Sequence, residues 1–182
     1  GCSQTQDIII SQPPALNITA SAVAVGCNGG SDGEVDVTSA IGGTGSFSYS
    51  VDGTVYQSGT DFQDLTANTY TVYVRDAAGC IGTTTAVVSQ PNAITAVVSP
   101  TATACNGSYD GSINIAPTGG TGSYSYSING TDFQGTGVFS DVPAGTYTVT
   151  VKDEHNCSYT TTTTITQPSA ITATINTTTS TC

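Results

Sequence analysis

Hydrophobic and polar residues alternate with a period of two along several short stretches of the chain. In residues 47–51 aromatic and aliphatic side chains alternate with serine, and in residues 70–74 they alternate with threonine and tyrosine. This period is typical of a β-strand that buries one of its faces. Two β-branched stretches, residues 18–25 and 83–88, predict further strands at either end of the same region.

The alternation also predicts the turns and the inward side chains. Asp52-Gly53 and Asn129-Gly130 each follow an alternating stretch directly. They favour two-residue hairpin turns of type I′, in which both residues have positive φ. The inward side chains expected in the first region are Val35, Val37, Phe47, Tyr49, Val51, Phe62, Leu65, Tyr70, Val72 and Val74.

The whole pattern occurs twice. Cys-Asn-Gly at 27–29 recurs at 105–107, and Gln-Pro begins at Gln12, Gln90 and Gln167, which are 78 and 77 residues apart. We therefore expect a segment of a longer protein that contains two whole repeats and two partial ones. The predicted divisions are residues 1–14 as the C-terminal strand of a preceding repeat, 15–91 and 92–168 as the two whole repeats, and 169–182 as the first strand of a following repeat.

Each repeat is predicted to be a small β-sandwich. About seven short strands in under 80 residues, separated by regularly spaced turns, indicate an immunoglobulin-like sandwich. The predicted fold class is therefore all-β, with tandem immunoglobulin-like domains in a head-to-tail array. Domains of this size bury a modest core, so covalent cross-links are expected to supplement it.

The charge balance excludes two classes of partner. The chain has 13 acidic residues against two cations, Arg75 and Lys152, and a formal net charge of −11. No basic patch can form to neutralise nucleic-acid phosphates or to attract an anionic membrane surface. No apolar stretch is long enough to cross a bilayer, so we predict neither nucleic-acid binding nor membrane insertion.

No set of residues predicts catalysis, and we expect no enzyme activity and no cofactor. The one histidine, His155, lies in a polar stretch whose counterpart in the first repeat has no histidine. A nucleophile would need a general base, and the first repeat offers none. The Tyr residues outside the inward set, candidates for stacking on sugars, do not recur at matching positions; they are Tyr56, Tyr73, Tyr109 and Tyr159.

A metal site is not predicted either. Asp32, Glu34 and Asp36 lie close together in the first repeat, but the corresponding part of the second repeat offers only Asp110. Ca²⁺ requires six to eight oxygen ligands, often from several carboxylates. We therefore interpret the Asp-Gly segments as turns, with at most an incidental weak ion site in the first repeat.

The six cysteines form two classes by position. Cys2, Cys80 and Cys157 follow the Tyr-x-Val-x-Val stretch, and Cys27, Cys105 and Cys182 belong to Cys-Asn-Gly or its equivalent. The regular spacing, without Cys-x-x-Cys, predicts disulfides rather than zinc.

The sandwich places the two classes at opposite ends of a domain. A strand of ~8 residues spans ~26 Å, whereas a disulfide needs Cα atoms within about 7 Å. The favoured pair is therefore Cys27 with Cys157, across the junction between repeats, with Cys80 and Cys105 bonded to repeats before and after. Two alternatives stay open: Cys27 with Cys80 together with Cys105 with Cys157, or Cys80 with Cys105.

The repeated motifs resemble a known family. Cys-Asn-Gly, Gly-Gly-Thr-Gly, Ala-Gly-Thr-Tyr-Thr-Val-Thr-Val and Ile-Thr-Gln-Pro are similar to the SprB-type repeat of large gliding-motility and cell-surface adhesins of Bacteroidota, which are substrates of type IX secretion. The resemblance implies an extracellular location at the cell surface and a role in adhesion and gliding.

We therefore expect a structural segment of a long adhesin filament or stalk. Its partners would be neighbouring repeats of the same chain and other copies in a filament. The alternatives are a repeat module that binds surface polysaccharide and a non-catalytic spacer of a large secreted enzyme.

Overall fold

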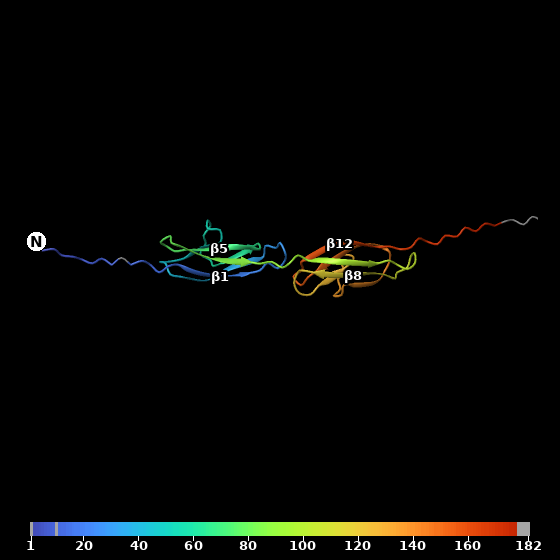
Figure 1. The fold of residues 1–182 in the computed structure, drawn as a ribbon, viewed down its shortest axis with the longest axis horizontal. Coiled ribbons are helices and arrows are strands. Elements are labelled where there is room, and N and C mark those ends of the chain that lie inside the picture. The colour runs from blue at the N-terminus through green and yellow to red at the C-terminus, as the bar shows by residue number, and fades with distance from the viewer. Residues whose placement is uncertain (1, 10, 178–182) are drawn as a thin grey trace, which may run out of the picture. The chain divides into compact units, whose positions relative to one another are not determined.

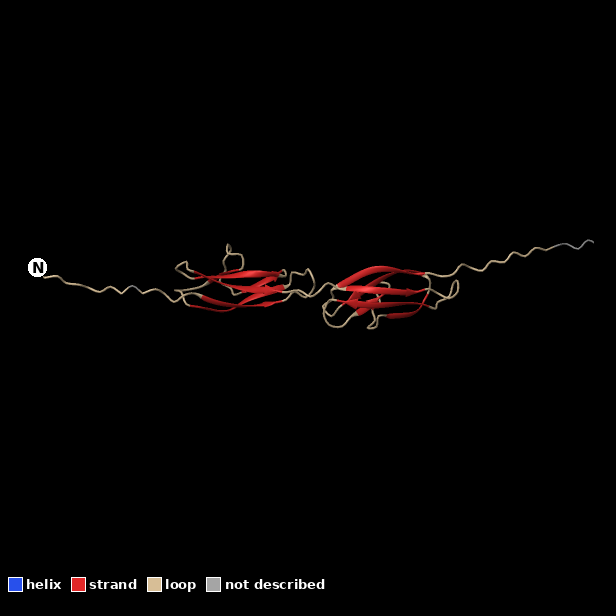
Figure 2. Cartoon of the chain, viewed as in Figure 1, coloured by secondary structure: helices blue, strands red, loops and turns tan. Residues whose placement is uncertain are grey.

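The computed structural model describes residues 2–9 and 11–177. Within these residues every regular element is a β-strand, and Figure 2 contains no helix. The strands belong to two compact units, which divide between Pro91 and Asn92. Because each unit has its own sheets and its own core, each is described by itself.

The first unit is a sandwich of two antiparallel sheets. One sheet has the order β1-β2-β4 and the other the order β3-β5-β6. Figure 1 shows β1 and β5 in separate layers. The strands are β1 (Asn17–Val23), β2 (Gly33–Ile41), β3 (Ser48–Ser50), β4 (Asp61–Leu65), β5 (Asn68–Arg75) and β6 (Ile81–Val88).

The second unit repeats this topology strand for strand. Its sheets have the orders β7-β8-β10 and β9-β11-β12, again antiparallel, and β8 and β12 are labelled in its two layers in Figure 1. The strands are β7 (Thr95–Thr101), β8 (Gly111–Thr118), β9 (Ser125–Ser127), β10 (Val138–Val142), β11 (Gly145–Lys152) and β12 (Ser158–Ile165).

This topology is immunoglobulin-like. In constant-type immunoglobulin domains strands A, B and E share one sheet and strands C, F and G form the other. The six strands of each unit match these two sets in order, without strand D. The predicted all-β sandwich is confirmed, with six strands in each unit rather than the seven expected. The segment after β3 pairs with that strand through an isolated bridge, Tyr49 to Gln57.

The two-residue hairpin turns of type I′ predicted at Asp52-Gly53 and Asn129-Gly130 are wrong. Gly53 and Gly130 have positive φ, but among the described residues the non-glycine positions with positive φ are Asp64, Asp141 and Asn156, so neither turn is of type I′. β3 and β4 lie in different sheets and do not pair.

A side chain organises this loop instead. Asp52 Oδ1 accepts hydrogen bonds from the backbone N–H groups of Thr54 (2.7 Å) and Val55 (2.9 Å), as in an Asx turn. The buried Ser50 hydroxyl also bonds Asp52 Oδ1, at 2.8 Å. The chain therefore leaves β3 in a loop that crosses to the other sheet.

The predicted core is confirmed. All ten inward side chains expected in the first region belong to one hydrophobic cluster, in which Val35, Val72 and Val74 are fully buried. Strand β1 adds Ile18 to this core and strand β6 adds Val88. The second unit has an equivalent cluster of its own.

The described parts of the two terminal segments form no strands. Residues 2–9 and 11–14, and residues 169–177, are irregular. A β-strand needs a partner to satisfy its backbone groups, and the described parts of these segments pair with no strand, so the strands predicted there are not formed. Cys182, Gly1 and the remaining C-terminal residues lie outside the described residues.

Candidate functional site

His155 lies in the turn between β11 and β12. Its ring Nδ1 is 2.5 Å from the hydroxyl of Thr121, and its backbone N–H donates to Asp153 Oδ1 at 3.0 Å. These contacts connect two turns of the second unit.

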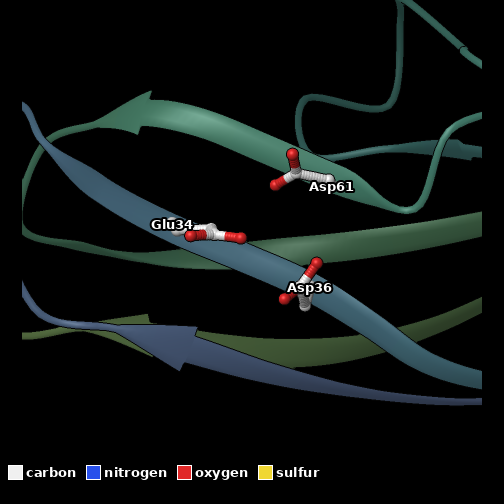
Figure 3. Close-up of side chains that lie close together, drawn as sticks. All are labelled: Glu34, Asp36 and Asp61. Carbon is white, nitrogen blue, oxygen red and sulfur yellow. The ribbon is translucent and has the colours of Figure 1, made fainter.

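The acidic residues of the first unit gather differently from the sequence prediction. Glu34 and Asp36 on β2 are joined by Asp61 on the neighbouring strand β4, and one oxygen of each lies within 4.8 Å of the others (Figure 3). Asp32 is not part of this group, because its carboxylate accepts hydrogen bonds from the backbone N–H of Gly26 at 3.0 and 3.1 Å. Asp61 was missed because the pairing of β2 with β4 is non-local.

Crowding of the three carboxylates perturbs Glu34. A hydrogen bond with Asp61 raises the pKa of Glu34, and desolvation and repulsion from Asp61 and Asp36 raise it further. The corresponding positions of the second unit are Ser112, Asn114 and Val138. The acidic cluster is therefore a property of the first unit and not of the repeat.

The Cys27 turn is bound to the Gln-Pro segment at the end of the first unit. The side-chain amide of Asn28 donates to the carbonyl of Pro91 at 3.0 Å, and the backbone N–H of Gly29 donates to Gln90 Oε1 at 2.8 Å. The second unit has the same pair of bonds, from Asn106 to Pro168 and from Gly107 to Gln167.

These contacts explain why Cys-Asn-Gly and Gln-Pro recur together. The bonded residues of the two motifs are about 60 positions apart in the sequence of each repeat, at 63 and 61 positions in the first repeat. The two motifs are nevertheless joined in space by these hydrogen bonds. Each Cys-Asn-Gly turn is held against the end of its own unit. The sequence contained both motifs but no signal that one binds the other.

The second class of cysteine lies in the hairpin that joins the last two strands of each unit. A buried aspartate orders this hairpin. Asp76 accepts hydrogen bonds from the backbone N–H groups of Thr44 (2.9 Å) and Cys80 (2.8 Å), and Asp153 does the same with Thr121 (3.0 Å) and Cys157 (2.9 Å). These bonds tie the hairpin to the Gly-Gly-Thr-Gly turn.

The cysteines differ in their bonding. Cys27 and Cys157 are each disulfide-bonded, whereas Cys2, Cys80 and Cys105 carry free, exposed thiols. The alternative pairing of Cys27 with Cys80 and of Cys105 with Cys157 is therefore not the one in this structure.

The two free cysteines inside the units line open hollows. Cys105 lies beside residues 168–171, after the last strand of the second unit. Cys80 lies beside residues 12–16, before the first strand of the first unit. The two classes of cysteine therefore occupy opposite ends of the fold, as the sandwich prediction required.

Each unit also carries a cation over an aromatic ring, and Arg75 is exposed while Lys152 is half-buried. The Arg75 guanidinium lies 4.0 Å from the centre of the Tyr56 ring, and the Lys152 ammonium lies 4.6 Å from that of Phe133. Tyr56 and Phe133 are equivalent positions 77 residues apart, as are Arg75 and Lys152. Because the second ring is phenylalanine, matching tyrosine positions in the sequence does not reveal this recurrence.

The solved structures to which the chain is similar include immunoglobulin-domain arrays of Dscam1 and titin. The chain is 15% identical to the N-terminal four Ig domains of Dscam1 isoform 9.44, with a TM-score of 0.37. The match covers 87% of this chain and 47% of the Dscam1 chain. The chain is 14% identical to an I-band fragment of titin, with a TM-score of 0.41. That match covers 87% of this chain and 66% of the titin chain. The chain thus spans about half the length of the Dscam1 structure. No curated protein matches it.

The family comparison agrees with the resemblance read from the motifs. The model of the SprB repeat matches residues 19–55 and 95–133. SprB repeats are found in cell-surface proteins. Within the described residues no helix is long and apolar enough to span a membrane. The SprB repeat model therefore matches one segment in each of the two immunoglobulin-like units.

Proposed function

We propose that this chain is a structural segment of a long extracellular adhesin, a filament or stalk that serves surface adhesion and gliding motility. The observation that carries the proposal is that each SprB match begins a separately folded β-sandwich. Such a unit can be added repeatedly to lengthen a protein, because each copy buries its own core.

The segment between the units supports a role as a connector with little slack. Pro91 is held by the Asn28 amide within the first unit, and the carbonyl of Asn92 accepts a hydrogen bond from Gly120 at 2.8 Å within the second. Both residues next to the division are therefore bonded to the body of their own unit. No Gly/Ser-rich linker separates them.

We further propose that a disulfide between Cys27 and Cys157 staples adjacent repeats. The Cys27 turn lies at the end of the first unit that leads into the connecting segment, and the Cys157 hairpin lies at the end of the second unit that follows this segment. Each of the two cysteines is disulfide-bonded. In a longer array Cys80 would bond the repeat before it, and Cys105 the repeat after it. Such bonds would be stable in the oxidising environment outside the cell.

Trypsin offers a simple test of the pairing. The chain has two cleavage sites, Arg75 and Lys152, so it yields peptides 1–75, 76–152 and 153–182. In a Cys2→Ser, Cys182→Ser variant digested without reduction, we expect peptides 1–75 and 153–182 to remain joined while 76–152 is released. Reduction should separate the joined pair.

The first alternative gives a different product in the same digest. Pairing of Cys27 with Cys80 and of Cys105 with Cys157 would join all three peptides and would contradict the staple. A Cys157→Ser variant is the control, since it should release all three peptides without reduction.

The cellular role is tested with Fab fragments raised against this chain. On intact gliding cells that produce the parent protein, we expect the Fab to label the outer surface and to slow attachment and gliding. Labelling only after the cells are opened would contradict the surface location. Surface labelling without any effect on attachment or gliding would contradict the role in motility.

A further inference from the structure

The two cations of the chain occupy one repeated site. Arg75 ends β5 and Lys152 ends β11, and each lies over the aromatic ring of the loop that follows β3 or β9. Because Tyr73 and Arg75 alternate with the buried Val72 and Val74, they lie on the outer face of the sheet. The site therefore opens to solvent in both units.

The cations keep their polar groups available. Within the described residues neither Arg75 nor Lys152 forms an ion pair, although the chain has 13 acidic residues. The loop carboxylates are already engaged: Asp52 accepts backbone N–H groups, and Asp132 accepts the side-chain amide of Asn129 at 2.7 Å. The N–H donors of both cations are thus free for an external acceptor.

The rest of the same face is lined with hydroxyl groups. On the second unit three pairs of threonines lie directly opposite one another on β11 and β12: Thr146 with Thr164, Thr148 with Thr162, and Thr150 with Thr160. On the first unit Thr71 lies opposite Thr85, and Tyr73 opposite Thr83. Each face combines an aromatic ring and a cation at one end with a row of hydroxyls along the strands.

We propose that this outer face of each unit binds a polysaccharide that carries carboxylates. A uronate carboxylate would accept charge-assisted hydrogen bonds from Arg75 or Lys152. The apolar face of a sugar ring would pack against the exposed part of Tyr56 or Phe133, and Phe133 is 36% exposed. The threonine hydroxyls would bond the sugar hydroxyls along the chain.

The net negative charge of the protein does not prevent this. Interactions between exposed charges are screened over a Debye length of about 8 Å at physiological ionic strength, so the acidic residues farther than this from the cation weaken binding little. The inference goes beyond the proposed stalk role and does not require it, since a stalk needs no ligand.

Affinity electrophoresis with polygalacturonate in the gel tests the proposal. We expect the chain to be retarded by polygalacturonate and about tenfold less by its fully methyl-esterified form, which lacks the carboxylates. This comparison uses the unmodified protein, so it does not depend on the folding of a variant. No retardation, or equal retardation by the ester, would overturn the proposal.

Matched variants locate the site. We expect the double variant Arg75→Gln, Lys152→Gln to lose about tenfold in apparent affinity. We expect Tyr56→Leu, Phe133→Leu to weaken binding, because an apolar side chain remains but the flat ring is removed. The control Ser39→Asp, Ala116→Asp changes the net charge by the same −2 on exposed positions of the other sheets. If the control lost as much affinity as the cation variant, general electrostatics would explain the binding and the site would be wrong.

Discussion

Asp153 holds Thr121 across 32 residues of sequence. Asp153 Oδ2 accepts the backbone N–H of Thr121 at 3.0 Å and also its hydroxyl at 3.4 Å, while Asp153 Oδ1 accepts the N–H groups of His155 and Cys157. The aspartate is 5% exposed. One carboxylate thus connects the Gly-Gly-Thr-Gly turn to the cysteine hairpin.

Removing this carboxylate should destabilise the second unit. Asp153→Ala leaves three backbone N–H groups without their acceptor, and we expect a loss of about 2–4 kcal/mol in the free energy of unfolding. Urea unfolding at pH 7 measures the effect. The control Asp7→Asn removes one negative charge from an exposed position outside both units' strands and should change the stability little. Equal stability of Asp153→Ala and Asp7→Asn would show that the turn does not depend on the aspartate.

Three aspartates should make the fold sensitive to acid. Hydrogen bonds from backbone N–H groups, chiefly that of Thr54 for Asp52 and that of Thr44 for Asp76, lower the pKa of both carboxyls. A bond from the Ser108 hydroxyl lowers the pKa of Asp110. Because the folded pKa lies below the ordinary value of 3.8, their stabilisation is present above that pH and is lost as the pH falls below it.

Asp52 offers a matched test of this acid sensitivity, because the second unit has Asn129 at the same place with the same acceptor role. We expect Asp52→Asn to reduce the loss of stability of the first unit between about pH 4 and pH 2.5. The reciprocal change, Asn129→Asp, should add such a loss to the second unit. Calorimetric melting over this pH range follows both transitions, and an unchanged pH profile in both variants would contradict the assignment.

Glu34 should have the opposite pH dependence. Its hydrogen bond with Asp61 and its repulsion from Asp61 and Asp36 raise its pKa, so its carboxyl favours the folded state when protonated, and this contribution is lost as the pH rises through the folded pKa. We expect Glu34→Gln to raise the melting temperature at pH 7 and to have little effect near pH 3. Glu154→Gln, outside the cluster, is the control. A lower melting temperature of Glu34→Gln at pH 7 would show that the cluster is not repulsive.

The period-two pattern was sufficient to predict the fold because it reports directly which face of a strand is buried. Val35, Val72 and Val74 alternate with polar residues and are fully buried. The hairpins at Asp52-Gly53 and Asn129-Gly130 failed because the same residues also favour an Asx turn. The choice between the two depends on where the next strand pairs, and that is a non-local property.

The site was harder to predict, because it depends on contacts between distant residues. The acidic cluster needs the pairing of β2 with β4 to bring Asp61 beside Glu34. The cation–aromatic pairs need the loop after β3 or β9 to return to the end of β5 or β11. Neither contact leaves a periodic signal in the sequence. The cysteine classes could be placed at opposite ends of the fold because strand length alone separates them.

Gly111 lies where the structure requires a small residue, although its Asp-Gly sequence suggests a turn. A Cβ atom on Gly111, the buried first residue of β8, would lie 2.5 Å from the carbonyl oxygen of Val142 and 2.9 Å from Cγ2 of Ile165. The carbonyl belongs to the neighbouring strand and Ile165 is 1% exposed, so neither atom can move without disturbing the core.

We expect Gly111→Ala to destabilise the second unit by about 1–3 kcal/mol through overpacking. Gly135→Ala in the same unit is the matched control, because a Cβ atom there would meet nothing within 4 Å and its φ is not positive. The same methyl group, added at two glycines of one unit, should therefore have a large effect at the buried strand and almost none in the exposed loop. Denaturant unfolding of both variants measures the difference, and equal midpoints would show that β8 and β10 are packed less closely than the structure has them.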